Sequence, residues 1–265
     1  MIKLIASDMD GSLLNNKKEI PSDFFPTIER LKQRNIVFAA ASGRSYPKLE
    51  EDFKAVLQDI YFICDNGALV MKQGKILYQN CIDPQGLYEI IEACESIPNI
   101  LLVLCGTQGA WHKPCPEEFR SHLRAYYIKN HVVEDLHSVR DSIFKIAICD
   151  LNGAANNCFP ILNSQFGNRY SGAVSGPLWM DIMNQGVNKG AALRMIQRDC
   201  GASREETMAF GDYDNDIELL QNAAYSYVMA NAKEEMRQYG RFVAPSNEEN
   251  GVLRTIRRVI FQETE

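Results

Sequence analysis

The sequence lacks several features that would assign it to a membrane or secreted class. Spanning a bilayer takes about 20 consecutive apolar residues, and the best apolar runs here, such as IVFAAAS and ILLVLC, have only the length of strands. No signal peptide is evident at the amino terminus, because few apolar residues separate Lys3 from Asp8. We therefore expect a cytoplasmic protein with no membrane partner.

The eight cysteines include no CxxC pair. In a chain without an export signal, we expect them to be reduced and mostly buried thiols. Cys105, His112 and Cys115 could in principle share a metal, but a fourth ligand at useful spacing is missing. The four histidines form no HExxH pair, so we expect them to be surface or packing residues.

Basic residues are not in excess. The formal net charge is -6 and the pI is near 5.4, which argues against nucleic acid as the main partner, because binding its phosphates needs a basic face. The contents of 46% hydrophobic and 23% charged residues are those of a soluble globular protein. A chain of 265 residues can form one large domain or two ordinary ones.

Short motifs for several other activities are also missing. There is no GxxxxGK[ST] or GxGxxG loop for nucleotides and no GxSxG nucleophile elbow. Acidic residues at alternate positions start at Asp8 and at Asp212, as in a calcium-binding loop. The glycine that such a loop requires is replaced by Leu13 in the first window and by Ile217 in the second.

Strand-like and helix-like stretches alternate in the first third of the chain and again from about residue 186. The first strands are expected at 2–7, 36–42 and 61–64, with helices at 21–35 and 47–57 and a hairpin turning at Gln73-Gly74. This alternation predicts a parallel sheet with helices on both faces. Residues 83–185 contain their own strands and helices, with helices expected at 84–96, 116–130 and 153–165. The sequence thus predicts an α/β core, residues 1–82 and 186–265, with an inserted lid-like domain at 83–185.

Polar residues follow the predicted strands of the core. In an open parallel sheet, ligands bind beyond the carboxyl ends of the strands. The residues at or near these ends, or at the start of a helix after the inserted block, are Asp8, Asp10, Ser42, Asn66, Asp212 and Lys189. Taken singly, each is commonly a cap, a turn former or a solvated residue. Their placement at one edge of one sheet is what favours a functional site.

The chemistry of these groups is consistent with phosphoryl transfer. Carboxylates in the plural suit a hard cation such as Mg²⁺, and Lys189 and Ser42 could hold phosphate oxygens. One aspartate could attack phosphorus and another, two residues away, could shuttle a proton.

Four motifs occur in a fixed order: DMDGS at 8–12, ASGR at 41–44, NKG at 188–190 and GDYDND at 211–216, reinforced by CDNGA at 64–68. In these motifs and in the position of the insertion, the chain resembles the haloacid dehalogenase (HAD) superfamily, and closely its Cof-type phosphatases with a C2B cap (subfamily IIB). The resemblance spans essentially the whole chain. It implies a Rossmann-like parallel-sheet core with an inserted α+β C2B cap.

The resemblance also implies roles for the motif residues. Asp8 is expected to be the nucleophile, passing through an aspartyl-phosphate, and Asp10 the general acid and base. Mg²⁺ is expected to be held by the Asp8 carboxylate, the Asp10 carbonyl and Asp212, with Asp216 orienting metal-bound waters.

Further residues are expected around the phosphate. By the same resemblance, Ser42 and Lys189 bind the transferring phosphoryl group, and Asn215 lies near the phosphate or Lys189. Two pairs, Gly43 with Arg44 and Asn66 with Gly67, complete the substrate-binding set. For Arg44 and Asn66 a purely structural role stays equally open.

Two departures from the family pattern are visible. Ser12 stands where threonine is usual, which keeps the hydroxyl. Tyr213 and Asp214 stand where the family often begins with a small residue, and Asp214 is expected to face solvent. Neither change removes a group that the reaction needs.

The sequence therefore predicts a Mg²⁺-dependent phosphatase, a monomer or weak homodimer, acting on a small phosphorylated metabolite, with sugar phosphates the commonest expectation. The leaving group is expected to be read by cap loops such as residues 106–114. A phosphomutase and a non-catalytic phosphometabolite-binding regulator remain alternatives, and a receiver domain fits this split architecture poorly.

Overall fold

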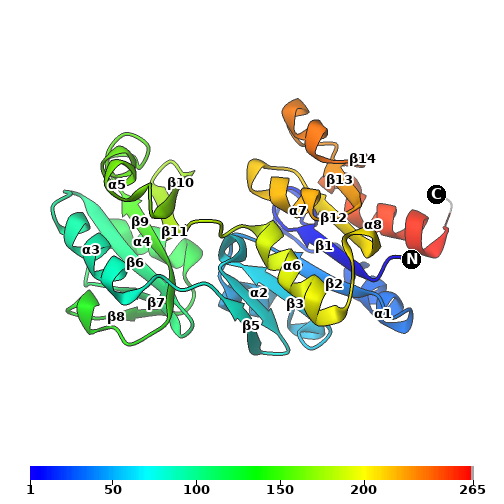
Figure 1. Cartoon of the computed structure of the whole chain (residues 1–265), viewed down its shortest axis with the longest axis horizontal. Helices are drawn as coiled ribbons and strands as arrows, with labels where there is room; N and C mark the ends of the chain where they lie inside the picture. The colour runs from blue at the N-terminus through cyan, green and yellow to red at the C-terminus, as the bar shows by residue number, and fades with distance from the viewer. Residues whose placement is uncertain (264–265) are drawn as a thin grey trace. The chain divides into compact units, whose positions relative to one another are not determined.

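A computed structural model describes residues 1–263 of the chain (Figure 1). The chain divides into two compact units, one formed by Met1–Tyr78 with the chain from Asn188 onward and the other by Gln79–Val187. Among the described residues, no helix is both long and apolar enough to cross a bilayer.

The first unit is built on an eight-stranded sheet in the order β14-β13-β12-β1-β2-β3-β4-β5. The strands from β14 to β3 run parallel and β4 is antiparallel to β3. Their bounds are β1 Leu4–Asp8, β2 Val37–Ala41, β3 Ile60–Cys64, β4 Leu69–Lys72, β5 Lys75–Gln79, β12 Thr207–Gly211, β13 Tyr225–Met229 and β14 Phe242–Ala244. The predicted α/β fold with a mainly parallel sheet is confirmed.

Helices pack on both faces of this sheet because its central strands are apolar on both sides. On one face, Leu193 of α6 and Leu219 of α7 join a buried cluster with Leu4. On the other, the ring of Phe24 from α1 packs edge-on against Phe38, with centroids 5.3 Å apart. The helices of the unit are α1 Phe24–Gln33, α2 Tyr46–Asp52, α6 Lys189–Cys200, α7 Ile217–Gln221 and α8 Gly251–Ile256.

Two helix boundaries of this unit differ most from the sequence prediction. The first helix begins at Phe24 rather than at residue 21, which places Pro26 in the first turn, where its missing N–H costs no intrahelical bond. The helix expected at 47–57 ends at Asp52 and is followed by a 3₁₀ turn. The 3₁₀ segments are Lys54–Val56, Asp65–Gly67, Leu136–Ser138, Arg204–Glu206, Asp214–Asp216, Glu234–Tyr239 and Asn247–Glu249, and a π-helical turn covers Arg257–Phe261.

The second unit contains a six-stranded sheet in the order β10-β11-β9-β6-β7-β8. Its pairs are antiparallel except for β7 with β8. The bounds are β6 Ile100–Gly106, β7 Gly109–His112, β8 Asn130–Val132, β9 Ile143–Asp150, β10 Tyr170–Gly176 and β11 Trp179–Asn184, with helices α3 Pro84–Glu95, α4 Glu117–Tyr126 and α5 Cys158–Phe166.

One face of this sheet carries the core of the unit. Ile91 of α3 and Leu162 of α5 pack there against Ile148 of β9. The helix expected at 153–165 begins only at Cys158, whose backbone N–H donates to the buried carboxylate of Asp150 (2.9 Å). Strand β10 was not predicted, because Tyr170–Gly176 consists largely of glycine, serine and alanine, which carry little apolar signal.

Candidate active site

Polar residues from three neighbouring strands meet at the carboxyl edge of the eight-stranded sheet. Asp8 is the last residue of β1, and it lies in register with Ala41, the last residue of β2. Ser42 follows β2, and Asp212 follows β12, which is the neighbour of β1 on its other side. Because these strands are parallel, residues distant in the sequence come to one edge.

Lys189 is the buried centre of this edge. Its Nζ donates to Oδ1 of Asp8 (2.5 Å) and to Oδ1 of Asp216 (2.6 Å), although the residue is only 1% exposed. Lys189 is the first residue of α6, and the Asn188 side chain caps that helix by accepting from the N–H of Ala191 (2.7 Å). The cap therefore fixes the position of the Lys189 backbone, from which the side chain extends to the strand ends.

Three carboxylates form a cluster beside this lysine. Asp8, Asp212 and Asp216 each offer an oxygen, and these atoms all lie within 4.8 Å of one another. Oδ2 of Asp216 accepts from the backbone N–H of Asp212 (3.0 Å), and the hydroxyl of Ser12 donates to Oδ1 of Asp212 (3.0 Å). The sequence reasoning assigned Ser12 no contact, and its position in the DMDGS motif was the available signal.

Burial sets the electrostatics of the cluster. It raises the pKa of Asp8 well above the ordinary value, and the charge of Asp216 adds to this while Lys189 opposes it. Burial and Asp216 also raise the pKa of Asp212 to about 6. One ammonium thus faces three carboxylates. An all-oxygen set with surplus negative charge is what a hard divalent cation requires, so these residues fit such an ion.

The side chain of Asp10 contacts basic residues and not the lysine of the acid cluster. Its carboxylate accepts from Nε (3.0 Å) and Nη2 (2.7 Å) of Arg44 and from Nζ of Lys18 (2.7 Å). Arg44 is held in turn by Asp52 (3.0 Å). Burial alone would raise the pKa of Asp10, but the hydrogen bonds from Arg44 and Lys18 outweigh it and lower the pKa. Lys18 and Asp52 lie outside the motifs and were missed by sequence reasoning.

The remaining predicted residues line the same edge. Ser42 is buried, and its Oγ accepts from the backbone N–H of Arg44 (3.1 Å). Gly43 approaches the side chain of Asn66. Asn215 donates to Oδ1 of Asn66 (3.0 Å).

Gly67 fixes the path of the backbone next to Lys189. Its φ of +103° lies in the region that favours glycine. A Cβ atom at this position would collide with the carbonyl of Asn188, the residue that caps α6. The glycine therefore permits the close approach of the two loops.

Comparison with known proteins places the chain in a family. The model of the haloacid dehalogenase-like hydrolase family matches residues 5–256. The chain is 28% identical to the 5-amino-6-(5-phospho-D-ribitylamino)uracil phosphatase YbjI of Escherichia coli strain K12, over 99% of this chain and 97% of that protein. It is 26% identical to the HMP-PP phosphatase of Enterobacter sp. strain 638, over 89% of this chain and 87% of that protein.

Solved structures show the same fold. SMU.1108c from Streptococcus mutans UA159 superposes with a TM-score of 0.84 at 29% identity, covering 98% of this chain and all of that one. The HAD subclass IIB sugar phosphatase BT4131 superposes with a TM-score of 0.77 at 20% identity, covering 97% and 98%. The likeness to BT4131 shows the fold alone.

The chain belongs to the haloacid dehalogenase-like hydrolase family. Within it, the chain is a Cof-type phosphatase, an enzyme of the phosphoric monoester hydrolase class. The resemblance seen in the sequence motifs is confirmed.

Proposed function

We propose that this protein is a Mg²⁺-dependent phosphatase that hydrolyses phosphomonoesters of small metabolites through an aspartyl-phosphate on Asp8. The observation that carries the proposal is the buried Lys189, whose ammonium contacts both Asp8 and Asp216 beside Asp212. A buried charge cluster of this kind is costly to maintain unless it serves chemistry.

Asp8 attacks phosphorus in the first step. A carboxylate oxygen forms a bond to phosphorus while the ester bond to the leaving oxygen breaks, which leaves the phosphoryl group on Asp8. Lys189 stabilises the negative charge on the phosphoryl oxygens, and the Ser42 hydroxyl donates to one of them. Both residues are buried and preorganised by their contacts.

Asp10 handles the protons. Its carboxylic acid protonates the leaving oxygen, and the resulting carboxylate takes a proton from the water that then attacks the phosphoryl group. That attack breaks the bond to Asp8 and releases inorganic phosphate. Because Arg44 and Lys18 hold the Asp10 carboxylate in the structure, the acid step requires Asp10 to leave these partners.

The residues that would hold Mg²⁺ are the Asp8 carboxylate, the Asp10 carbonyl and Asp212, with Asp216 orienting its waters. When bound, the ion supplies positive charge that stabilises the negative charge of the transferring phosphate. The raised pKa values of Asp8 and Asp212 support this assignment, because the cluster has more negative charge than Lys189 balances.

The rest of the phosphate pocket is assigned to loops at the same edge. Gly43 and Arg44 follow the phosphate-binding serine, and Asn66 and Gly67 form the floor. Asn215 positions Asn66 through their hydrogen bond.

The inserted domain selects the leaving group. It comprises residues 83–185, and the core comprises residues 1–82 before it and 186–265 after it in the chain. Support for a small substrate comes from relatives named as phosphatases of a phosphoribitylamino-uracil and of HMP-PP. A neighbour of the same fold is named a sugar phosphatase, so sugar phosphates head the candidates. None of the eight cysteines is in a disulfide, which supports the cytoplasmic location that we propose.

The test is phosphate release from a panel of phosphorylated sugars, nucleotides and cofactors, with Mg²⁺ and with a chelator. We expect turnover only with the metal and without any bisphosphate activator, which a phosphomutase would need. Asp8→Asn is expected to abolish release, and Asp214→Asn, at an exposed neighbouring acid, serves as its matched control. Wild-type turnover in Asp8→Asn would overturn the mechanism.

A further inference from the structure

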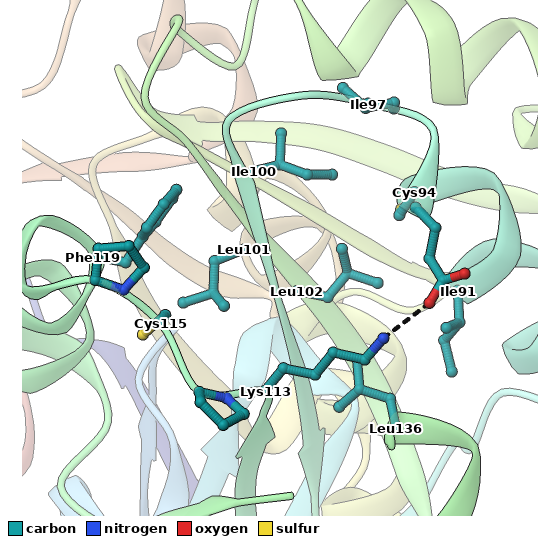
Figure 2. A pocket seen from close by; sticks show the side chains of 13 residues that line it. Ile91, Cys94, Ile97, Ile100, Leu101, Leu102, Lys113, Cys115, Phe119 and Leu136 are labelled. Carbon is teal, nitrogen blue, oxygen red and sulfur yellow. Dashed lines mark hydrogen bonds and ion pairs between the residues drawn. The ribbon is translucent and has the colours of Figure 1, made fainter. Parts of the chain in front are cut away.

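The second unit contains a cavity of about 270 Å³, and no residue of the acid cluster lines it (Figure 2). Its walls come from α3, from the first residues of β6 and from residues 113–116. Apolar side chains line most of it: Ile91, Ile97, Leu101, Leu102, Phe119 and Leu136. We propose that this cavity is a binding site for a free α-amino acid with an apolar side chain.

The volume sets the size of the ligand. An apolar cavity of about 150 Å³ accepts benzene, and drug-sized ligands occupy about 300 Å³ or more. The cavity of about 270 Å³ therefore has room for the side chain of leucine or phenylalanine with its α-carbon at the opening.

One ion pair lies between the two walls of the opening. Nζ of Lys113 is 2.8 Å from Oε1 of Glu95, and the dashed line in Figure 2 marks this contact. The two side chains are 38% and 50% exposed. An ion pair this exposed contributes little to stability, so the charges of a ligand can separate its partners at small cost.

The charges of the opening select a zwitterion. An incoming carboxylate would pair with Lys113, and an incoming ammonium would pair with Glu95. Glu95 is also the last residue of α3, and a helix carboxyl end favours a positive charge. A ligand with a carboxylate alone would leave Glu95 without its lysine, and a simple amine would leave Lys113 without its glutamate. An α-amino acid keeps all four charges paired.

The edge of β6 supplies further polar groups. Pairing of β6 with β7 stops at Leu104 and Trp111. If this pairing continued, Lys113 would lie opposite Leu102. The carbonyl of Lys113 accepts a hydrogen bond from Nδ1 of His112 (2.8 Å) instead. The N–H of Leu151 donates to the carbonyl of Asn99 (3.1 Å), so these two residues form a hydrogen-bonded pair. In antiparallel strands such pairs alternate with pairs that are not hydrogen-bonded. The backbone N–H and C=O of Leu102, three residues after Asn99, therefore point away from β9. They face the open edge, where ligand groups can bond to them.

The experiment is calorimetric titration of the full chain with L-leucine and with two matched analogues. 4-Methylvalerate lacks the ammonium and isoamylamine lacks the carboxylate. We expect L-leucine to bind with a 1:1 stoichiometry and each analogue to bind at least about tenfold more weakly, the loss expected for one charged hydrogen bond. Equal affinity for either analogue, or no heat at millimolar leucine, would overturn the proposal.

Variants locate the binding. Lys113→Met and Glu95→Gln are each expected to weaken leucine binding by about tenfold. Lys129→Met, at an exposed lysine of the same unit, is the matched control and should leave the affinity unchanged. Cys115→Trp, which places a large ring at the cavity wall, should abolish binding. Unchanged affinity in Lys113→Met would show that leucine binds elsewhere. Because both charged side chains are partly exposed to solvent, their variants are expected to fold.

Discussion

Nζ of Lys189 lies 2.5 Å from Oδ1 of Asp8, although 181 residues separate the two positions in the chain. The contact is buried, and Asp216 shares the same ammonium. Breaking it by removing the lysine leaves two acids without their shared counterion.

Lys189→Met should therefore be strongly destabilising. Removing one partner of a buried ion pair costs about 3 to 5 kcal/mol, and chemical denaturation at neutral pH would measure the loss in unfolding free energy. Lys72→Met is the matched control, because Lys72 pairs with Asp199 at the surface (2.9 Å) and should lose less than about 1 kcal/mol. A cost for Lys189→Met no larger than that of the control would contradict the buried-pair interpretation.

Asp8→Asn should separate stability from activity. Folding raises the pKa of Asp8, chiefly through burial, so at neutral pH the ionised carboxylate opposes folding. This destabilisation is absent at a pH below the pKa of Asp8 in the unfolded state, and it is complete at a pH above the pKa in the folded state. In the presence of a chelator, the melting temperature of Asp8→Asn should equal or exceed that of the wild type. With Mg²⁺ present, its turnover should be lower than that of the wild type by more than about 10³-fold. A lower melting temperature for this variant under chelation would count against the electrostatic account.

Mg²⁺ should stabilise the protein through the acid cluster. At a concentration about 100-fold above its Kd, a ligand specific for the folded state adds about 2.7 kcal/mol, which thermal unfolding would detect. Asp212→Asn should lose this gain, whereas Asp214→Asn, at the exposed neighbour, should keep it. Equal stabilisation in both variants would place the ion elsewhere.

Asp141 should give the second unit a pH-dependent stability. Its carboxylate accepts from Thr107 Oγ1 (2.7 Å), Trp111 Nε1 (2.9 Å) and two backbone N–H groups. Partial burial opposes ionisation, but these bonds outweigh it and lower the pKa. Because the folded pKa is depressed, the stabilisation is present above the unfolded value near 3.8 and is lost as the pH falls through the folded value.

Asp141→Asn tests this. It should cost about 1 to 2 kcal/mol of unfolding free energy at pH 7, allowing for the partial exposure of the group, and less at pH 3. Glu134→Gln, at an exposed acid of the same unit, should show no such difference. A cost for Asp141→Asn that is equal at the two pH values would refute the assignment.

Gly67→Ala should impair the active site more than the fold. Both Gly67 and Gly74 have positive φ, but a Cβ at Gly67 meets the carbonyl of Asn188 whereas one at Gly74 meets open space. Both substitutions should therefore cost about 1 kcal/mol of backbone strain. Only Gly67→Ala should also lower kcat, because it displaces the start of α6 and with it Lys189. Equal kcat in the two variants would show that the close approach has no catalytic value.

The sequence predicted much of the fold because its signals are local. Apolar strands such as 60–64 are bounded by polar turns, and helices such as α3 begin with Asp83-Pro84 and carry a periodic apolar face. Strand β10 and the late start of α5 escaped prediction, since they depend on pairing with β11 and on a cap from Asp150, respectively.

The motifs by themselves determined which residue types gather at the strand ends: one aspartate at the end of β1 and another just after it, a serine after β2, a lysine opening α6 and an acidic loop after β12. They could not determine which side chains touch. Only the tertiary structure placed Asp10 against Arg44 and Lys18, Ser12 against Asp212, and Asn215 against Asn66. Such partners come from different strands and loops, so their contacts depend on how the sheet edge packs and not on the spacing of residues along the chain.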